Sequence, residues 1–329
     1  MTTSKKKLLL PSTMARAGWN VLAGRDDVEA VGFDHGIPTS AFHALLADTD
    51  GVALGLTPFG EAEIRAAPHV TVVARHGVGY DTVDVAALTR HGIPLMVTGS
   101  ANSPSVAEQA LCFMFALAKR DAAMHALVRE RRWASRLAEE LPVDLFGKTV
   151  LVVGFGRIGT RLAKVCVALG MTVLVYDPYV KPAAIEAGGC VPQSDLDAAV
   201  SAADFVSIHC PKTPETVGMF NAARLARMKP SAFLINTARG GIIDEAALHG
   251  ALTRKVIRGA GLDVFDREPP ATDNPLLDLP SVITAPHMAG VTKESLDRMA
   301  VAVATNLLEV LDGKPNMDHV VNKEVFGHR

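Results

Sequence analysis

The chain of 329 residues is longer than one typical domain, so we expect two domains that each bury a core of their own. Hydrophobic residues make up 49% of it, charged residues 21%, and the formal net charge is −2, which argues against a nucleic-acid partner. The longest strongly apolar stretch, residues 111–118, is far shorter than the ~20 residues that cross a bilayer, and we find no secretory signal. We therefore expect a cytoplasmic protein that binds neither nucleic acid nor a membrane.

The sequence offers no pattern typical of a metal site. Its 11 histidines show no HExxH or comparable spacing, and its 4 cysteines show no CxxC spacing. Most of the cysteines lie in apolar stretches, which predicts buried free thiols. These cysteines are Cys112, Cys166, Cys190 and Cys210.

The first hundred residues alternate short apolar runs with helical patterns, which predicts a small parallel α/β domain. We expect its strands at residues 7–11, 28–34, 51–56, 70–75 and 94–98. A helix is then predicted from Ser103, where Pro104 occupies the first turn and Glu108 lies three residues after Ser105. This helix could carry the chain into a second domain.

Residues 121–141 form a charged helical pattern that contains Trp133. One interpretation makes this segment an arm that packs on a second subunit. The other makes it a solvated surface helix with Trp133 buried beneath it. The sequence alone favours neither.

A second run of six apolar strands alternating with helices follows and predicts a doubly wound parallel sheet. We expect these strands at residues 149–154, 172–177, 205–210, 232–236, 259–264 and 282–284. A last helical pattern at 293–311 could cross back to the first unit, which would make the N-terminal domain discontinuous. The predicted domains are therefore 1–102 with 293–329, and 103–292.

A glycine fingerprint lies where the first strand of the second domain meets a helix. Gly154 permits the tight turn, Gly156 lets backbone approach a pyrophosphate, and Gly159 lets the helix pack close to the strand. Asp177 lies 18 residues after Gly159, at the end of the next strand, where a carboxylate accepts hydrogen bonds from the adenosine ribose hydroxyls. An anion there repels a 2′-phosphate, so the sequence predicts NAD rather than NADP.

Hydride transfer to nicotinamide needs a proton donor or acceptor and a cation for a substrate carboxylate. His287 follows the last strand, Arg239 follows the strand at 232–236, and Glu268 lies on a Pro-containing loop after the strand at 259–264. Each residue alone also has an ordinary interpretation: a capping or core histidine, a surface salt bridge, and a solvated loop acid. All three are candidates at the carboxyl edge of the sheet, where doubly wound folds bind ligands, but the residues alone leave both interpretations open.

Six motifs in chain order resemble those of the D-isomer-specific 2-hydroxyacid dehydrogenases. They lie at residues 77–81, 105–108, 154–159, 209–216, 236–240 and 286–290. The resemblance implies an α/β protein with a doubly wound Rossmann NAD-binding domain and a discontinuous flavodoxin-like substrate domain. It also implies that the protein interconverts a D-2-hydroxy acid and its 2-keto acid with NAD, as a homodimer whose arm is the 121–141 segment.

By this resemblance, Arg239 binds the substrate, His287 is the general acid and base, and Glu268 stabilises the protonated imidazole. The backbone amides of Val78 and Gly79 would hold the substrate carboxylate. The remaining cofactor contacts that the resemblance implies are Arg157, Ile158, Cys210 and Thr216, with the Ala238 carbonyl and Asp263 positioning the nicotinamide carboxamide.

Two residues depart from the family pattern. Gln109 stands where many members have histidine, and Lys212 takes a place that is usually apolar. Neither lies on the predicted proton path, so they bear on substrate or packing detail. Because the sequence stops at Arg329, we do not expect serine feedback through a C-terminal regulatory domain.

The substrate prediction depends on Arg75, which precedes the predicted carboxylate loop. Members with an arginine here resemble the phosphoglycerate dehydrogenase branch, which favours a phosphorylated or otherwise dianionic 2-hydroxy acid. If Arg75 instead pairs with Asp81 or Asp84, a hydroxypyruvate or glyoxylate reductase is the alternative. An NAD-sensing binding protein similar to the C-terminal-binding corepressors is a further alternative, disfavoured by the lack of a long disordered tail.

Overall fold

The computed structural model of the chain describes residues 5–138 and 140–327. The chain divides into two compact units, one made of residues 1–102 and 291–329 and the other of residues 103–290. The first unit is therefore discontinuous in sequence. Each unit has its own parallel sheet, so the mixed α/β class expected from the sequence is confirmed.

The first unit contains a five-stranded parallel sheet in the order β2-β1-β3-β4-β5. This is the flavodoxin-like order, which agrees with the expected fold. Both faces of the sheet are covered, so its inner strands contain continuous apolar runs, as in Leu8, Leu9 and Leu10 of β1, which are all fully buried. The strands are β1 (Lys6–Pro11), β2 (Val28–Phe33), β3 (Gly51–Leu54), β4 (Val72–Arg75) and β5 (Leu95–Met96).

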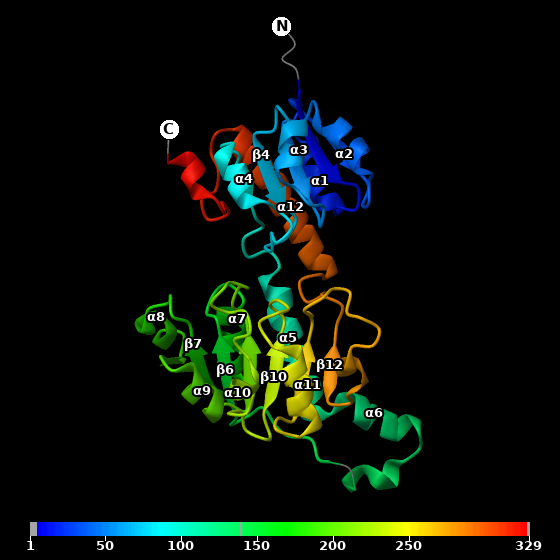
Figure 1. The fold of residues 1–329 in the computed structure, drawn as a ribbon, viewed down its shortest axis with the longest axis vertical. Coiled ribbons are helices and arrows are strands. Elements are labelled where there is room, and N and C mark those ends of the chain that lie inside the picture. The colour runs from blue at the N-terminus through cyan, green and yellow to red at the C-terminus, as the bar shows by residue number, and fades with distance from the viewer. Residues whose placement is uncertain (1–4, 139, 328–329) are drawn as a thin grey trace. The chain divides into compact units, whose positions relative to one another are not determined.

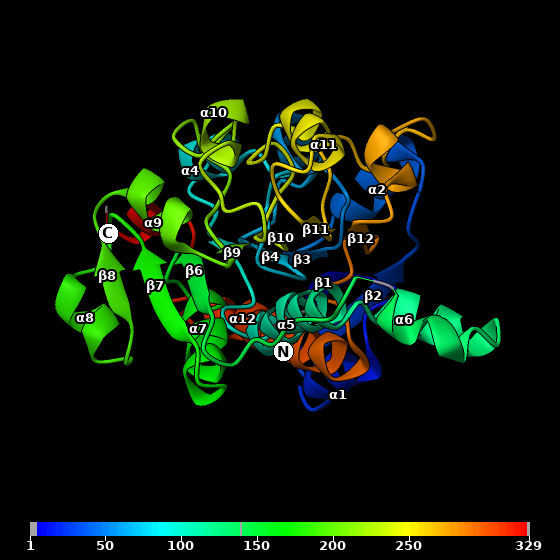
Figure 2. The same ribbon diagram turned by 90° about the horizontal axis from the view of Figure 1, so that it is seen from below.

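Two layers of helices cover this sheet (Figures 1 and 2). One layer packs on the face of Leu8 and Leu10, and the other packs on the face of Leu9. The first layer consists of α1 (Arg16–Ala23) and α12 (Lys293–Leu311), and the second of α2 (Thr39–Leu46), α3 (Glu61–Ala66) and α4 (Val85–Arg90). The returning helix predicted at 293–311 thus has the predicted bounds, and it lies in the N-terminal unit.

The end of the chain completes the first unit. The amide of Val97 donates to the carbonyl of His319 (2.9 Å), and the amide of Val321 donates to the carbonyl of Leu95 (2.9 Å). Asn322 is 1% exposed, and its side chain accepts from the Leu95 amide (2.7 Å) and donates to the Ile93 carbonyl (2.9 Å). A short 3₁₀ turn (Lys323–Phe326) follows.

We expect Asn322→Leu to lower the free energy of unfolding by about 2–4 kcal/mol, because it leaves buried amide and carbonyl groups unpaired at nearly constant volume. Urea unfolding followed by circular dichroism measures this. Asn316→Leu is the matched control, since Asn316 is exposed, and should change stability by less than about 1 kcal/mol. Equal effects of the two substitutions would contradict a structural role for the Asn322 contacts.

The second unit contains a seven-stranded parallel sheet in the order β12-β11-β10-β9-β6-β7-β8. The six strands predicted from the sequence are present, although several are shorter than predicted. The prediction missed β8, a three-residue edge strand that contains Pro192 and has no fully buried residue. Proline and weak burial are tolerated at an edge, and they remove the apolar signal. The strands are β6 (Thr149–Val153), β7 (Thr172–Tyr176), β8 (Val191–Gln193), β9 (Phe205–Ile208), β10 (Phe233–Asn236), β11 (Gly259–Leu262) and β12 (Val282–Thr284).

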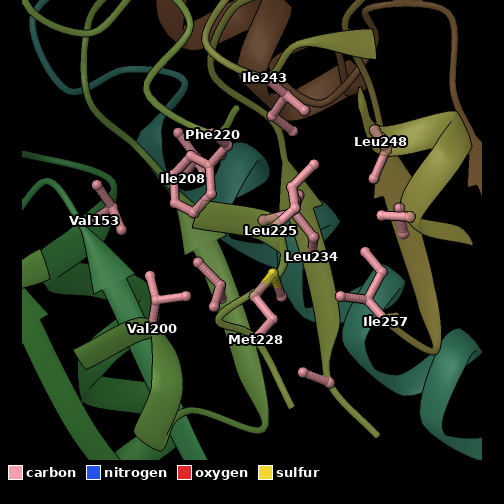
Figure 3. Packing of buried hydrophobic residues seen from close by; sticks show 14 of the residues in the cluster. Val153, Val200, Ile208, Phe220, Leu225, Met228, Leu234, Ile243, Leu248 and Ile257 are labelled. Atoms are coloured by element: carbon pink, nitrogen blue, oxygen red, sulfur yellow. The ribbon is translucent and has the colours of Figure 1, made fainter. Parts of the chain in front are cut away.

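Helices also cover both faces of this sheet (Figure 2). On one face, Val153, Ile208 and Leu234 of the sheet pack with Val200 and Leu248 of the covering helices (Figure 3). The helices of that face are α9 (Leu196–Ala202), α10 (Ala222–Leu225) and α11 (Glu245–Thr253), and those of the other face are α5 (Ser103–Lys119) and α7 (Gly159–Ala168). The short helix α8 (Pro182–Glu186) precedes β8, and a 3₁₀ turn (Pro275–Asp278) precedes β12.

The 121–141 segment begins with α6 (Asp121–Arg129), which extends away from the sheet (Figure 1), and continues in a 3₁₀ turn (Trp133–Leu137). Trp133 is 63% exposed, so the interpretation with a buried Trp133 is wrong. Its neighbours Leu137 and Leu141 are also exposed, because this segment projects beyond the core of its own unit.

The prediction of buried thiols is wrong for Cys112. This residue lies on the outward face of α5, whereas Ala110 and Met114 of the same helix point into the core. Cys166 and Cys190 are buried, and Cys210 is half-buried. None of the four forms a disulfide.

Candidate active site

The glycine loop of the second unit connects β6 to α7. Gly154 has φ of +96°, and a Cβ there would lie 2.7 Å from the backbone nitrogen of Cys210. A Cβ on Gly159 would lie 2.0 Å from the carbonyl oxygen of Gly154, so only glycine permits this turn to close. A Cβ on Gly156 would meet no atom within 4 Å, which leaves its backbone open to a ligand at the start of α7.

Asp177 lies directly after β7 and is tied to the glycine loop. Its Oδ2 accepts from the Phe155 amide (2.7 Å), and its Oδ1 accepts from the Tyr179 amide (2.9 Å). These two bonds orient the carboxylate at the edge of β6 and β7, and each oxygen keeps a lone pair for a ribose hydroxyl. The arrangement fits the dinucleotide site that the sequence predicts. Arg157 is exposed and Ile158 is half-buried in the same loop.

Cys210 and Thr216 lie in the loop after β9. Burial raises the pKa of the Cys210 thiol to about 11, so it stays protonated. Thr216 is 8% exposed, and its hydroxyl donates to the Pro211 carbonyl (2.7 Å) while accepting from the Thr213 amide (2.8 Å). In this arrangement Thr216 orders its own loop.

Arg239 follows β10 at the same carboxyl edge of the sheet. Its Nη1 donates to the Ala238 carbonyl (2.7 Å), and its own carbonyl accepts from Asn236 Nδ2 (2.9 Å). A Cβ on Gly240 would lie 1.8 Å from the carbonyl oxygen of Phe265, so the loops after β10 and β11 touch backbone to backbone. This close approach places Arg239 beside the loop that contains Glu268.

Lys212, which departs from the family pattern, lies near this turn. Its Nζ is 2.8 Å from where a Cβ on Gly241 would stand, and the Gly241 amide donates to Asp266 Oδ1 (2.6 Å). The lysine therefore places a cation beside Gly241, which lies two residues after Arg239 in the chain.

Glu268 and His287 form a direct pair. His287 Nδ1 lies 2.6 Å from Glu268 Oε2, and Glu268 Oε1 accepts from the Phe265 amide (3.1 Å). The side chain of His287 is 46% exposed and that of Glu268 is 36% exposed, so the pair is accessible from solvent. Because Nδ1 faces the carboxylate, Nε2 is the nitrogen that is left to exchange a proton with a substrate.

His287 has φ of +54°, a left-handed conformation that costs a non-glycine residue about 1–2 kcal/mol. Contacts with Asp263 offset this strain. The His287 amide donates to the Asp263 carbonyl (2.8 Å), and the carboxylate of Asp263 accepts from the amides of Met288 (2.8 Å) and Ala289 (2.9 Å). Burial raises the pKa of Asp263. Asp263 thus fixes the loop that presents His287, whatever further contact it makes with a cofactor.

The predicted substrate contacts Arg75, Val78 and Gly79 belong to the first unit. Arg75 ends β4, and its Nη1 donates to the His76 carbonyl. Val78 and Gly79 are half-buried in the loop that follows, which is held by a bond from the Thr98 amide to the Gly77 carbonyl (3.1 Å). Asp84 accepts from the Ala87 amide (2.9 Å) as the N-cap of α4.

Two buried imidazoles, His76 and His209, were not predicted as functional residues. His76 and His209 each have a ring nitrogen that is buried and has no hydrogen-bond partner among the described residues. Desolvation lowers the pKa of His76 to about 4, with Arg75 adding to the effect, and lowers that of His209 to about 3. His209 Nε2 lies 2.8 Å from Ser207 Oγ. A histidine directly after an apolar strand was the available signal.

These two imidazoles make stability depend on pH. Unfolding restores a pKa of ~6.5 to each imidazole, so between about pH 6.5 and pH 4 the unfolded chain binds more protons than the folded chain, and stability falls as pH falls. We expect each histidine to withdraw about 1–2 kcal/mol between pH 7 and pH 5. His209→Gln, which can keep a bond to Ser207, should reduce this loss, as measured by urea unfolding at both pH values. An unchanged pH dependence would contradict the assignment.

Within residues 5–138 and 140–327, no helix is long and apolar enough to cross a membrane. No group of three or more His, Cys, Asp and Glu side chains in the same ranges is placed to hold a metal ion.

Comparisons with known proteins bear on this arrangement. The model of the "D-isomer specific 2-hydroxyacid dehydrogenase, NAD binding domain" matches residues 111–289. The chain is 40% identical over 324 residues to a D-3-phosphoglycerate dehydrogenase of Mycobacterium bovis, covering 96% of this chain and 59% of the relative. It is 39% identical over 283 residues to a glyoxylate reductase of Korarchaeum cryptofilum, covering 84% of each. The chain therefore spans about three fifths of the length of the phosphoglycerate dehydrogenase that it matches.

A solved structure agrees with these sequence matches. The D-lactate dehydrogenase of Aquifex aeolicus, solved with NAD and lactic acid, superposes with a TM-score of 0.82 at 28% identity, covering 96% of this chain and 99% of that one. Residues 111–289 are thus an NAD binding domain of the expected kind. The chain belongs to the D-isomer specific 2-hydroxyacid dehydrogenase family.

Proposed function

We propose that this protein is an NAD-dependent dehydrogenase that interconverts a D-2-hydroxy acid and its 2-keto acid. The observation that carries the proposal is the 2.6 Å contact between Glu268 and His287, at the sheet edge that also holds Arg239 and the glycine loop. A charge-assisted pair of this kind suits a histidine that gains and loses a proton during turnover. Membership of the dehydrogenase family supports the same conclusion.

Each residue has a distinct part in the proposed reaction. Arg239 binds the carboxylate of the 2-keto acid and polarises its ketone through its planar guanidinium. The glycine loop and Asp177 would hold NADH, which would supply a hydride to the carbonyl carbon when bound. His287 then donates the proton on Nε2 to the resulting oxygen, while Glu268 stabilises the imidazolium before the transfer. Oxidation of the hydroxy acid reverses these steps.

We propose a phosphorylated or otherwise dianionic hydroxy acid, such as D-3-phosphoglycerate, as the substrate. The position of Arg75 at the end of β4 and the match to phosphoglycerate dehydrogenases support this choice. The alternative is reduction of hydroxypyruvate or glyoxylate, which the match to a glyoxylate reductase supports. NAD is proposed over NADP because Asp177 places a carboxylate beside the ribose site.

The test is NADH oxidation with a panel of 2-keto acids: phosphohydroxypyruvate, hydroxypyruvate, glyoxylate, pyruvate, oxaloacetate and a branched acid. We expect phosphohydroxypyruvate to have the highest kcat/KM. A higher value for hydroxypyruvate would favour the reductase alternative. No turnover with any acid, despite NADH binding, would contradict the dehydrogenase proposal.

Arg75→Leu separates the two substrate assignments. We expect it to raise the KM for phosphohydroxypyruvate about 10–100-fold, because a charge-assisted bond to the second anionic group is lost, and to change hydroxypyruvate reduction much less. Arg65→Leu, which replaces an exposed side chain of α3, is the control for loss of one positive charge in the same unit. If Arg75→Leu impairs reduction of both keto acids equally, Arg75 supports the structure of its loop and does not bind the phosphate.

We also propose a cytoplasmic homodimer, as the family resemblance implies. The exposed side chains of Trp133, Leu137 and Leu141 support an arm that a second subunit covers. The four free cysteines fit a reducing compartment. Light scattering of the purified protein tests the dimer, and a monomeric mass would contradict it.

A further inference from the structure

A hydrogen bond links two loops at the adenosine side of the NAD-binding unit. Tyr179 lies two residues after Asp177, in the loop that follows β7, and Glu215 lies in the loop that follows β9. The Tyr179 hydroxyl donates to Glu215 Oε2 at 2.6 Å. The residues are 36 positions apart in the sequence, so the bond is a tertiary contact.

The sheet order shows what this bond crosses. In the order β9-β6-β7, β6 lies between the two strands whose loops are joined. All three strands are parallel, so their carboxyl ends lie at one edge. A bond from the loop after β7 to the loop after β9 therefore passes across the end of β6, where the glycine loop begins at Gly154.

Both ends of this bridge are anchored. The Tyr179 amide donates to Asp177 Oδ1 (2.9 Å), and the same carboxylate accepts from the Phe155 amide in the glycine loop (2.7 Å). The loop of Glu215 is ordered by the Thr216 hydroxyl, which bonds to the Pro211 carbonyl (2.7 Å). The bridge thus links the loop after β7 to the loop after β9, and Asp177 ties it to the glycine loop.

Tyr179 is highly exposed, although its hydroxyl is held by the bond to Glu215. The side chain is 78% exposed, so its ring gains little from burial within this chain. An aromatic ring fixed in solvent at a binding edge offers a flat apolar surface to a ligand. The Tyr179 hydroxyl bonds to Glu215 and its amide bonds to Asp177, and these two carboxylates, Glu215 foremost, raise the pKa of the Tyr179 phenol.

We propose that Tyr179 and Glu215 form a clasp over the adenosine end of the cofactor site, which adds affinity for adenosine and selects a free 2′-hydroxyl over a 2′-phosphate. The ring contributes contact area to the adenosine. Glu215 adds a second carboxylate to that of Asp177, so a 2′-phosphate near both would be repelled by two like charges. This inference rests on the proposed use of NAD, and it assigns cofactor selectivity to residues beyond Asp177.

The experiment measures the binding of ADP-ribose and 2′-phospho-ADP-ribose by calorimetry, to wild type, Tyr179→Phe and Glu215→Gln. Neither ligand contains nicotinamide, so the measurement is independent of turnover. We expect Glu215→Gln to tighten the binding of the phosphorylated ligand about 5–10-fold and to change ADP-ribose binding less than about 3-fold, because it removes one charge and keeps an acceptor. Tyr179→Phe should weaken ADP-ribose binding about 3–10-fold by freeing the ring.

Glu186→Gln, on the exposed surface of α8, is the control for the loss of one carboxylate from the same unit, and it should change neither affinity. If both variants bind the two ligands as wild type does, the bond is a surface contact only and the proposal is overturned. A wild-type protein that binds neither ligand also overturns it. If ADP-ribose binds and the variants respond as expected, but no keto acid is reduced, the clasp stands and the proposed function fails.

Discussion

Replacing His287 with asparagine is expected to lower kcat for keto-acid reduction by about 10²–10⁴-fold, the usual contribution of a positioned general acid. The substitution suits this site because His287 has φ of +54°, and asparagine tolerates the left-handed region better than alanine does. The Asp263 contacts to the following backbone remain, so the fold and the NADH affinity should be kept. Steady-state kinetics and NADH fluorescence titration measure the two quantities.

Two further variants define the role of His287. His249→Asn, on α11, is a matched control and should keep wild-type activity. Glu268→Gln keeps an oxygen for Nδ1 but removes the charge, and we expect it to lower kcat/KM about 10–100-fold. Near-normal kcat for His287→Asn would refute the assignment of this histidine as the acid and base.

Replacing Arg239 with leucine is expected to lower kcat/KM for 2-keto acids by about 10²–10⁴-fold, because the charge-assisted contacts to the substrate carboxylate are lost. Arg239→Lys should recover only a small part, since an ammonium cannot reproduce the planar two-point contact. The turn itself should persist, because Gly240 packs against the backbone of Phe265 and the Gly241 amide bonds to Asp266.

NADH affinity separates substrate binding from damage to the site. We expect the NADH dissociation constant to change less than about 3-fold in Arg239→Leu, because the guanidinium serves the substrate. Arg267→Leu, on an exposed part of the neighbouring loop, is the control for loss of one positive charge and should retain activity. A loss of NADH binding in step with activity would show that Arg239 supports the cofactor site instead.

The sequence already indicated both His287 and Arg239 as candidates, because strands and turns can be predicted from short segments. Apolar runs bounded by turns predicted eleven of the strands, and the spacing of Gly154, Gly156 and Gly159 predicted a turn that only glycine can form. The positions of Arg239, Glu268 and His287 after three strands also followed from local pattern. The carboxyl ends of parallel strands lie at one edge of the sheet, so a residue that directly follows a strand lies at that edge.

Other features escaped the sequence because they depend on contacts between distant segments. The edge strand β8 has a weak apolar pattern, and only its pairing with β7 defines it. The exposure of Trp133 and Cys112 depends on which faces the rest of the chain covers. Composition cannot decide which of these side chains is exposed, since apolar residues occur both in the core and on the surface of a protein.

The sequence by itself determined the fold class, the dinucleotide turn and the positions of Arg239, Glu268 and His287 after three strands, since each depends on local backbone preference or on strand order. Only the tertiary structure decided that Glu268 reaches His287 at 2.6 Å, that Asp263 fixes the loop of His287, and that Tyr179 reaches Glu215 across the end of β6. Such contacts join residues 19 to 36 positions apart. Their geometry follows from the packing of whole loops against one another, which no short stretch of sequence encodes.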